Sequence, residues 1–410
     1  MGYITDMDAK TKRVVALDEK VTAHNYAPLP VVLTRGKGVF AYDITGRRYF
    51  DMLSAYSALN QGHLHPKIVA AAKKQLSKLS LTSRAYHNDQ MGPFLEKLCK
   101  LTKMNKALPM NSGAEAVETA IKAMRLWGYR VKGIPNDMAE IIVVSDNFHG
   151  RTTTIVGFSS DPDSSYGFGP ATPGFKTIPY DDANALERAI TENTCGFLVE
   201  PIQGEAGVRI PSPGYLKAIR SICTEQNVLL CVDEIQTGLG RAGRLFCVDH
   251  ENVHPDIFVL GKALSGGLYP ISAVAADEKI LGLFEPGTHG STFGGNPLAS
   301  AIGSAALDVV VKEKLPKKSA EMGELFLEKL VSIDHPLIRE VRGQGLLLAL
   351  EFKKPIAKDF CKLLLKGGLL AKDTHEFTVR FAPPLVITKK QIEAAFKIIS
   401  AAMDTIKERE

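Results

Sequence analysis

The chain has 410 residues, of which 45% are hydrophobic and 23% charged, and its formal net charge is +5 at pH 7. This composition is typical of soluble globular proteins, and the length suffices for one large domain and a smaller one, so extensive disorder is not expected. The basic residues form no block or stripe, which argues against nucleic acid as the main partner.

The sequence lacks the patterns of membrane and exported proteins. No stretch approaches about 20 uninterrupted apolar residues, so we expect no membrane span. Residues 1–20 mix acidic residues with lysines and contain no apolar core, unlike a signal or transit peptide. The six cysteines show no C-x-x-C pair and no regular spacing, which predicts neither a disulfide framework nor a metal site. We therefore expect a cytoplasmic protein.

The first 60 residues differ in pattern from the middle of the chain. Residues 38–50 alternate apolar and polar residues around residues 44–47, which include a glycine. This alternation predicts a hairpin on a half-exposed sheet. We expect the segment to contribute to a small domain rather than to the main sheet.

A helix start suited to phosphate is predicted at residues 111–116. Ser112 is followed three residues later by Glu115, the pattern of a capping box, and apolar residues continue at helical spacing to about residue 129. Free amides at a helix start bind phosphate well, and Gly113 allows a close approach. A plain capped helix fits the same short pattern, so the motif needs support from other residues.

The middle of the chain alternates short apolar runs with helix-like stretches, a pattern typical of a parallel α/β sheet. Polar or charged residues come soon after four of these runs, which are residues 141–144, 196–199, 228–232 and 257–260. In such sheets, ligands bind in the crevice outside the carboxyl ends of the strands. The polar residues at these ends should therefore form one composite site.

Asp233 and Lys262 stand at two of these strand ends. A lysine at the end of a buried strand loses solvation, which lowers its pKa and lets the neutral amine attack a carbonyl. An aspartate beside a heteroaromatic nitrogen keeps that nitrogen protonated, which is how pyridoxal phosphate is held as an electron sink. Taken singly, Asp233 fits a loop cap and Lys262 a surface lysine, so the pair depends on the phosphate site for support.

Three further side chains belong to the candidate site. Phe148 follows its strand closely and suits stacking on a cofactor ring. Arg151 suits a bidentate pair with a carboxylate, although a surface salt bridge fits it equally. Arg380 is the better carboxylate clamp, because the flanking apolar residues and the prolines at 383 and 384 would hold it in place.

Other motifs receive no functional role. Residues 238–243 match G-x-G-x-x-G but neither follow their strand directly nor open a clear helix, so we predict a loop. His63 and His65 have no third metal ligand near in sequence and precede Pro66, which favours a turn. Cysteines inside apolar runs, such as Cys231, are expected to be small core residues.

The pattern changes again after about residue 310. Helical segments flank a strand candidate at residues 346–352, and a second candidate lies at residues 378–381. We predict an α/β fold in which residues 61–309 form a large domain with a mostly parallel central sheet between helices. Residues 1–60 and 310–410 would together build a smaller α+β domain.

At residues 233–238 and 261–267 the sequence resembles the signature of the class III aminotransferases, which belong to the fold-type I pyridoxal phosphate enzymes. His149 departs from the pattern, because tryptophan is expected there in many animal relatives. The resemblance extends from about residue 24 to residue 384, and its other segments are residues 24–26, 54–63, 147–152 and 200–207.

The resemblance implies pyridoxal phosphate as the cofactor and a homodimer or higher oligomer. Lys262 is then expected to hold the cofactor covalently and to transfer the proton, and Asp233 to pair with the ring nitrogen. The remaining implied contacts are Phe148 on the ring face, Gln236 at the ring hydroxyl, Ser112, Gly113 and Ala114 at the phosphate, and Ser291 with Thr292 at the phosphate of the neighbouring subunit. On its own, the Ser291 and Thr292 segment is a weak phosphate motif.

The implied reaction moves the δ-amino group of ornithine to 2-oxoglutarate in two half-reactions. Tyr26 and Arg151 would hold the α-amino acid end of ornithine, and Tyr56 would line the pocket. Glu205 would pair with Arg380 in the first half-reaction and release it in the second to bind the α-carboxylate of the 2-oxo acid. A pair of this kind avoids leaving the arginine uncompensated.

Other substrates and other functional classes remain as alternatives. Relatives that act on N-acetylornithine, 4-aminobutyrate or glutamate semialdehyde are the main rivals, and Tyr26 and Tyr56 favour ornithine because a bulky acyl group would meet aromatic walls. A cofactor-free binding protein would have no use for Asp233 together with Lys262. The hypothesis of a dinucleotide oxidoreductase is supported only by the G-x-G-x-x-G match.

Overall fold

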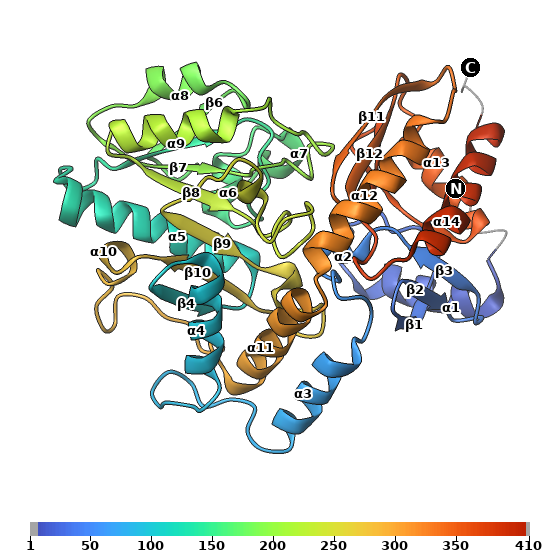
Figure 1. Ribbon diagram of the computed structural model, residues 1–410, viewed down its shortest axis with the longest axis horizontal. Coiled ribbons are helices and arrows are strands. Elements are labelled where there is room, and N and C mark those ends of the chain that lie inside the picture. The colour runs from blue at the N-terminus through green and yellow to red at the C-terminus, as the bar shows by residue number, and fades with distance from the viewer. Residues whose placement is uncertain (1–6, 407–410) are drawn as a thin grey trace.

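The structure is a computed structural model that describes residues 7–406. Figure 1 shows two lobes, one built from the middle of the chain and one in which both chain ends lie together. Within the described residues the strands form one sheet of seven and two sheets of four. No helix in that range is both long and apolar enough to cross a membrane.

The seven-stranded sheet forms the centre of the larger lobe, in the order β4-β10-β9-β8-β7-β5-β6. Only β10 runs antiparallel to its neighbours in the described sheet, so the prediction of a mostly parallel sheet is confirmed. The strands are β4 (Lys106–Met110), β5 (Glu140–Val144), β6 (Phe175–Ile178), β7 (Thr194–Val199), β8 (Leu229–Asp233), β9 (Ile257–Leu260) and β10 (Ser272–Ala276).

Successive side chains of the central strands enter two different clusters of buried apolar residues. In β8, Leu230 and Val232 belong to one cluster, whereas Leu229 and Cys231 belong to the other. Both faces of the sheet are thus covered, which explains why its strands read as unbroken apolar runs rather than as alternating patterns. The four predicted runs lie in β5, β7, β8 and β9, and Cys231 is a free, buried core residue as expected.

Helices cover the two faces of this sheet (Figure 1). Helix α5 supplies buried residues to one cluster, and α9 and α11 supply them to the other. The helices of this lobe are α3 (Pro66–Leu76), α4 (Met91–Thr102), α5 (Gly113–Trp127), α6 (Thr153–Gly157), α7 (Pro162–Ser165), α8 (Ala183–Ala189), α9 (Tyr215–Glu225), α10 (Glu278–Leu281) and α11 (Pro297–Lys312), with short turns η1 (Gly128–Lys132), η2 (Cys247–His250) and η3 (Lys262–Ser265).

The smaller lobe combines strands from both ends of the chain. Strand β13 pairs in parallel with β3, so residues near 50 and near 370 share a sheet. The hairpin predicted at residues 38–50 is confirmed, because β2 and β3 pair antiparallel across residues 44–47. Its strands are β1 (Leu33–Lys37), β2 (Phe40–Asp43), β3 (Arg48–Asp51), β11 (Ile338–Gln344), β12 (Leu347–Phe352), β13 (Leu369–Leu370), β14 (Lys372–Thr374) and β15 (Thr378–Phe381), and its helices are α1 (Ala9–Val21), α12 (Leu315–Val331), α13 (Ala357–Gly367) and α14 (Lys389–Thr405).

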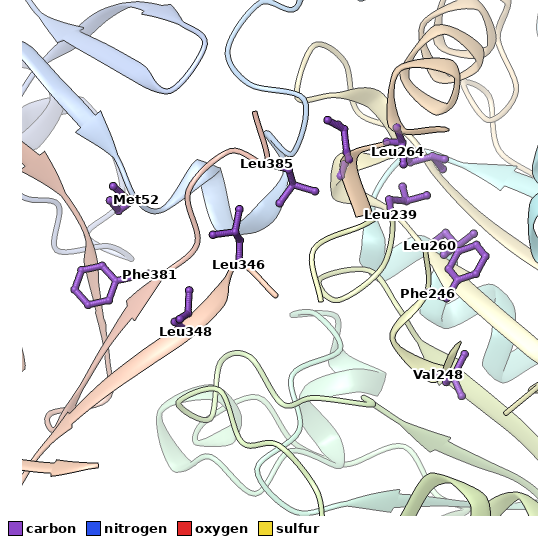
Figure 2. Packing of buried hydrophobic residues seen from close by; sticks show 14 of the residues in the cluster. Met52, Leu239, Phe246, Val248, Leu260, Leu264, Leu346, Leu348, Phe381 and Leu385 are labelled. Atoms are coloured by element: carbon purple, nitrogen blue, oxygen red, sulfur yellow. The ribbon is translucent and has the colours of Figure 1, made fainter. Parts of the chain in front are cut away.

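One apolar cluster continues from the smaller lobe into the larger one. Figure 2 shows its labelled side chains from Met52 and Phe381 in the smaller lobe to Leu260 and Leu264 beside the main sheet, with Leu385 between them. Buried apolar area is the main source of folding free energy, so a shared core fixes the two lobes relative to each other. This fixed arrangement matters because side chains from both lobes meet at the candidate site.

Candidate active site

A cavity of about 200 Å³ lies at the carboxyl ends of the central strands. Its position is the one that the sequence predicted from the polar residues after β5, β7, β8 and β9. The predicted residues that line it are Gly113, Ala114, Phe148, Glu205, Asp233, Gln236 and Lys262.

Lys262 begins turn η3, two residues after β9 ends, with φ at +46°. Left-handed backbone is costly for a residue other than glycine and is often found at functional sites. Burial lowers the pKa of the Lys262 amine, against the raising effect of the nearby Glu205 and Asp233 charges. Its side chain makes no hydrogen bond or ion pair with any residue from 7 to 406, so the amine is available for chemistry.

Asp233 is the last residue of β8 and is only 4% exposed. One carboxylate oxygen accepts a hydrogen bond from the Ile235 amide at 3.0 Å, and the other lies 2.7 Å from Nδ1 of His149. Because a carboxylate can only accept, Nδ1 must carry the proton. Burial alone would lower the pKa of His149, but the hydrogen bond to Asp233 and its charge outweigh burial and raise it.

The contact between His149 and Asp233 was missed at the sequence level. The two residues are 84 positions apart, and β7 lies between their strands, so no spacing signals it. His149 drew attention only as a departure from the family pattern. Its Nε2 atom is buried without a hydrogen-bond partner among the described residues, so Asp233 is the hydrogen-bond partner of this side chain there.

Glu200 is a second side chain to which the sequence assigned no role. It follows β7, is 6% exposed, and accepts a hydrogen bond from the Phe148 amide at 3.0 Å. Burial raises the pKa of Glu200 to about 8, partly offset by the charge of His149. The carboxyl group therefore holds a proton at neutral pH and fixes the backbone that carries the Phe148 ring.

The start of α5 has the predicted capping box. The Ser112 hydroxyl oxygen accepts from the Glu115 amide at 3.2 Å, and the Glu115 carboxylate accepts from the Ser112 amide at 2.8 Å. The amides of Gly113 and Ala114 line the cavity and have no acceptor among the described residues. Since Ser112 only accepts here, its hydroxyl proton and these two amides can all donate to one anion.

Glu205 and Arg380 form an ion pair at the side of the cavity. The two guanidinium nitrogens of Arg380 lie 2.6 and 3.4 Å from the two carboxylate oxygens. Burial would raise the pKa of Glu205, but the charges of Arg380 and Lys262 lower it to about 2. The arginine is 1% exposed, so it would be an uncompensated buried charge without this partner.

Gln236 lies against the ion pair. Its side-chain nitrogen donates to Glu205 at 2.8 Å, and its oxygen accepts from Arg380 at 3.3 Å. The carboxylate partner fixes the orientation of the amide, which leaves one N–H of Gln236 free. A side chain at residue 204 would overlap the amide group of Gln236, so glycine there leaves that amide in its place beside the ion pair.

Tyr56 faces Arg380 from an unusual turn. The ring centroid lies 5.4 Å from the guanidinium carbon of Arg380. The turn, labelled α2 (Ser54–Ser57), has four consecutive residues with φ between +47° and +73°. Burial and the charge of Glu205 raise the pKa of Tyr56. Tyr26 is near enough to add to that effect but is 77% exposed and lines neither cavity of the site.

Six other predicted residues do not line the first cavity, and of these only Arg151 lines the second: Ser112, Tyr56, Arg151, Ser291, Thr292 and Arg380. Arg151 lines an adjoining cavity of about 170 Å³ that shares Phe148 and Glu205 with the first. Ser291 accepts a hydrogen bond from Asn111 at 2.8 Å, and Thr292 is exposed. Within one chain, neither Ser291 nor Thr292 lines the two cavities.

The motifs set aside in the sequence have structural roles. Residues 238–243 form a loop, and its Arg241 is fully buried and hydrogen-bonded to carbonyl oxygens. His63 lies 2.7 Å from Asp51, and His65 lies 3.3 Å from Glu313. In the part of the chain from 7 to 406, no group of three or more His, Cys, Asp or Glu side chains could hold a metal.

Comparison with known proteins places the chain among enzymes. It is 57% identical over 389 residues to the ornithine aminotransferase of a Geobacillus species, covering 95% of this chain and 98% of that one. It is 54% identical to ornithine aminotransferase 2 of Staphylococcus aureus, covering 95% and 98% of the two chains.

Solved structures agree with these relatives. Ornithine aminotransferase from Toxoplasma gondii, whose active site partly contains pyridoxal phosphate, superposes with a TM-score of 0.95 at 45% identity, over 96% of this chain and 94% of that one. Acetylornithine aminotransferase from Elizabethkingia anophelis superposes with a TM-score of 0.89 at 48% identity, over 97% and 99%. Residues 21–403 match the family described as aminotransferase class III, and the chain is a member of that pyridoxal phosphate-dependent family.

Proposed function

We propose that this protein transfers the δ-amino group of L-ornithine to 2-oxoglutarate, giving L-glutamate 5-semialdehyde and L-glutamate in a ping-pong reaction. The observation that carries the proposal is the ion pair between Glu205 and Arg380 beside Lys262. It gives one pocket two charge states, neutral for the side chain of ornithine and cationic for 2-oxoglutarate. The names of the relatives at 54–57% identity support the same substrate.

The residues present fit pyridoxal phosphate. The free amides of Gly113 and Ala114 with the Ser112 hydroxyl suit the phosphate, and Phe148 lines the same cavity at a position suited to the ring face. Asp233 suits the ring nitrogen, and the free N–H of Gln236 suits the ring oxygen. The cofactor, when bound, supplies an electron sink for the carbon that bears the reacting amine.

The side chains of the site then have separate tasks. Lys262 is the proton carrier, because burial lowers the pKa of its amine and so favours the neutral form that can accept a proton. His149 holds the Asp233 carboxylate in place for the ring nitrogen by donating to it from Nδ1. Glu200 holds the loop of Phe148 through its amide.

Other side chains are proposed to bind the two substrates. Tyr26 and Arg151 are proposed to hold the α-amino acid end of ornithine, with Tyr56 lining the pocket between. In the second half-reaction Glu205 turns away and Arg380 binds the α-carboxylate of 2-oxoglutarate or glutamate. Arginine suits this task because its planar fork matches a carboxylate.

The working form is proposed to be a homodimer or higher oligomer. Ser291 and Thr292 line neither cavity of their own chain, and Thr292 is exposed, which leaves them able to reach the phosphate of a neighbouring subunit. A cytoplasmic location is also proposed, since all six cysteines are free, as expected in a reducing compartment. Small amino acids and 2-oxo acids are the partners this site suits.

Single half-reactions test the substrate assignment. The purified enzyme with its cofactor would be mixed with ornithine, N-acetylornithine or 4-aminobutyrate, and the change in cofactor absorbance would be followed. We expect ornithine to react fastest. N-acetylornithine is the second candidate because of the similar Elizabethkingia structure, and faster reaction with it would refute the ornithine assignment within the same family.

A further inference from the structure

We propose that Asp373 selects substrates with a free α-ammonium group, by pairing with that group while Arg151 binds the neighbouring α-carboxylate. The inference rests on the proposed function, and it assigns a role to a residue in the second cavity, of about 170 Å³. This cavity adjoins the one that contains Lys262.

The two cavities share Phe148 and Glu205 in their linings. A substrate chain whose terminal amine lies at Lys262 must therefore extend past Phe148 to reach the second cavity. Ornithine has its reacting amine and its α-carbon at opposite ends of the side chain. The second cavity is thus placed to receive the α-carbon with its ammonium and carboxylate groups.

Arg151 provides the positive charge of this second cavity. Arg151 is exposed, and its guanidinium carbon lies 5.5 Å from the centroid of the Phe148 ring, a contact that leaves its charge available. No carboxylate within residues 7–406 forms a salt bridge with it. An unpaired arginine in a cavity next to a catalytic lysine suits the carboxylate of a substrate.

The acidic side chains of the cavity differ in how many of their oxygens are engaged. Asp161 caps α7 with one oxygen and accepts from Ser164 with the other, at 2.6 Å. Asp146 accepts from Arg209 at 2.6 Å and from Ser160 at 3.4 Å. Both carboxylates are therefore committed to the protein, as is Glu205 to Arg380.

Asp373 is the exception among them. On β14, its Oδ1 atom accepts from the Lys372 amine at 2.7 Å, while its Oδ2 atom has no hydrogen-bond partner in the described chain. The side chain is 17% exposed, so the free oxygen is shielded from much of the solvent. An ammonium group in the cavity would form a charge-assisted hydrogen bond with that oxygen.

The unpaired Arg151 and the free oxygen of Asp373 together suit a zwitterion, such as the α-ammonium and α-carboxylate groups of an amino acid. An acyl group on the α-nitrogen removes the charge and adds bulk, and a substrate without the α-amine cannot make the charged hydrogen bond to the partly buried Asp373 oxygen. The site therefore distinguishes substrates by the group at their non-reacting end.

The test compares ornithine with 5-aminopentanoate, which keeps the carboxylate and the reacting amine but lacks the α-amine. Half-reactions of the holoenzyme and of Asp373→Asn would be followed by cofactor absorbance over a range of substrate concentrations. For ornithine we expect kcat/KM to fall about tenfold or more in the variant, mostly through the apparent Kd, because a charged hydrogen bond is lost. For 5-aminopentanoate we expect no change.

Asp146→Asn is the matched control, because Asp146 lines the same cavity with both oxygens engaged. It should not alter the ratio of kcat/KM values for the two substrates. Equal effects of Asp373→Asn on both substrates, or none on either, would overturn the role of Asp373. The proposed function fails separately, if the wild-type enzyme itself reacts faster with N-acetylornithine or 4-aminobutyrate than with ornithine. Reaction of 5-aminopentanoate also reports that the variant is folded.

Discussion

Asp233 ends β8 and Lys262 follows the end of the neighbouring strand β9 by two residues, so the geometry of the sheet brings a carboxylate and an amine into one cavity. Their surroundings then give them opposite properties. Burial lowers the pKa of Lys262, whereas Asp233 accepts a hydrogen bond from Nδ1 of His149. Lys262 thus suits the role of a base, and Asp233 that of a fixed hydrogen-bonding partner.

Replacing the lysine separates binding from turnover. Lys262→Ala should still bind pyridoxal phosphate through the other side chains of the cavity but should lose at least about a thousandfold in turnover, because the proton carrier is absent. Glutamate formation from ornithine and 2-oxoglutarate would be measured, together with cofactor content. Turnover within about tenfold of the wild type would contradict the role of Lys262.

Removal of the glutamate partner should change selectivity. Glu205→Ala leaves Arg380 uncompensated, so substrates with a carboxylate beside the reacting amine, such as glutamate, should gain about tenfold in kcat/KM relative to ornithine. Glu205→Gln is the matched variant, since it keeps a hydrogen-bonding group without the charge, and it should act in the same direction. An unchanged ratio of glutamate to ornithine would rule out the switch.

Glu200 should make stability depend on pH. Its pKa is raised from 4.5 to about 8 in the folded protein. Between these values the unfolded chain has released the proton and the folded chain has not, so stability falls as pH rises, by up to about 1.4 kcal/mol per pH unit. Glu200→Gln removes this dependence, so its Tm relative to the wild type should increase from pH 4.5 to above pH 8.

The control for that measurement is Glu187→Gln, which changes an exposed glutamate on α8. Its Tm difference from the wild type should be the same at both ends of the range. If Glu200→Gln also shows a constant difference, Glu200 does not hold a proton in the folded state.

At the scale of elements, the turn α2 stands out because its backbone is left-handed throughout. Such backbone costs about 1 kcal/mol or more for each residue with a side chain. The turn sets Tyr56 against Arg380, and Asp51 supports it by accepting hydrogen bonds from the amides of Leu53 and Ser54. Local strain is therefore maintained by contacts around the turn, at a place where it positions a pocket residue.

Glycine should relieve part of this strain. Ala55 is exposed with φ at +47°, so Ala55→Gly should raise the free energy of unfolding by up to about 1 kcal/mol. Ala58, with φ at −80°, is the control, and Ala58→Gly should lower it by about 0.5–1 kcal/mol. Denaturant unfolding measures both. Destabilisation of equal size by the two glycines would contradict the strain.

At the scale of the whole molecule, Arg241 joins segments from three parts of the chain. It donates to the carbonyl oxygens of Leu346 and Pro383 at 2.9 and 2.6 Å, and to the side chain of Asn60 at 2.7 Å. Burial lowers its pKa to about 9. These contacts lie where the loop after β8 meets the smaller lobe, near the shared apolar cluster.

Loss of this arginine should destabilise the whole fold. Arg241→Met leaves several buried acceptors without donors, which we expect to cost about 3 kcal/mol in the free energy of unfolding. Arg241→Lys keeps a cation but cannot reach all three partners at once. It should therefore lower the free energy of unfolding by less than Arg241→Met does. Thermal unfolding of both variants shows which of the two is the less stable. A stable Arg241→Met protein would show that the contacts are dispensable.

The sequence by itself determined the parallel sheet, the strand ends that carry the site, the capping box of Ser112, and the family. These features are local, because apolar runs, helix starts and short motifs consist of neighbouring residues. Parallel strands also have their carboxyl ends at the same edge of the sheet, independently of the loops that connect them. The residues 238–243 were correctly assigned to a loop for the same reason, because a dinucleotide motif needs an adjoining strand and helix.

Only the tertiary structure decided the electrostatics of the site. The contact of His149 with Asp233, the proton on Glu200 and the free oxygen of Asp373 depend on burial and on partners that are distant along the chain. Contacts between particular residues distant along the chain leave no periodic pattern in the sequence. The left-handed turn at Tyr56 was equally hidden, because Ser54–Ser57 contains no glycine to signal left-handed backbone.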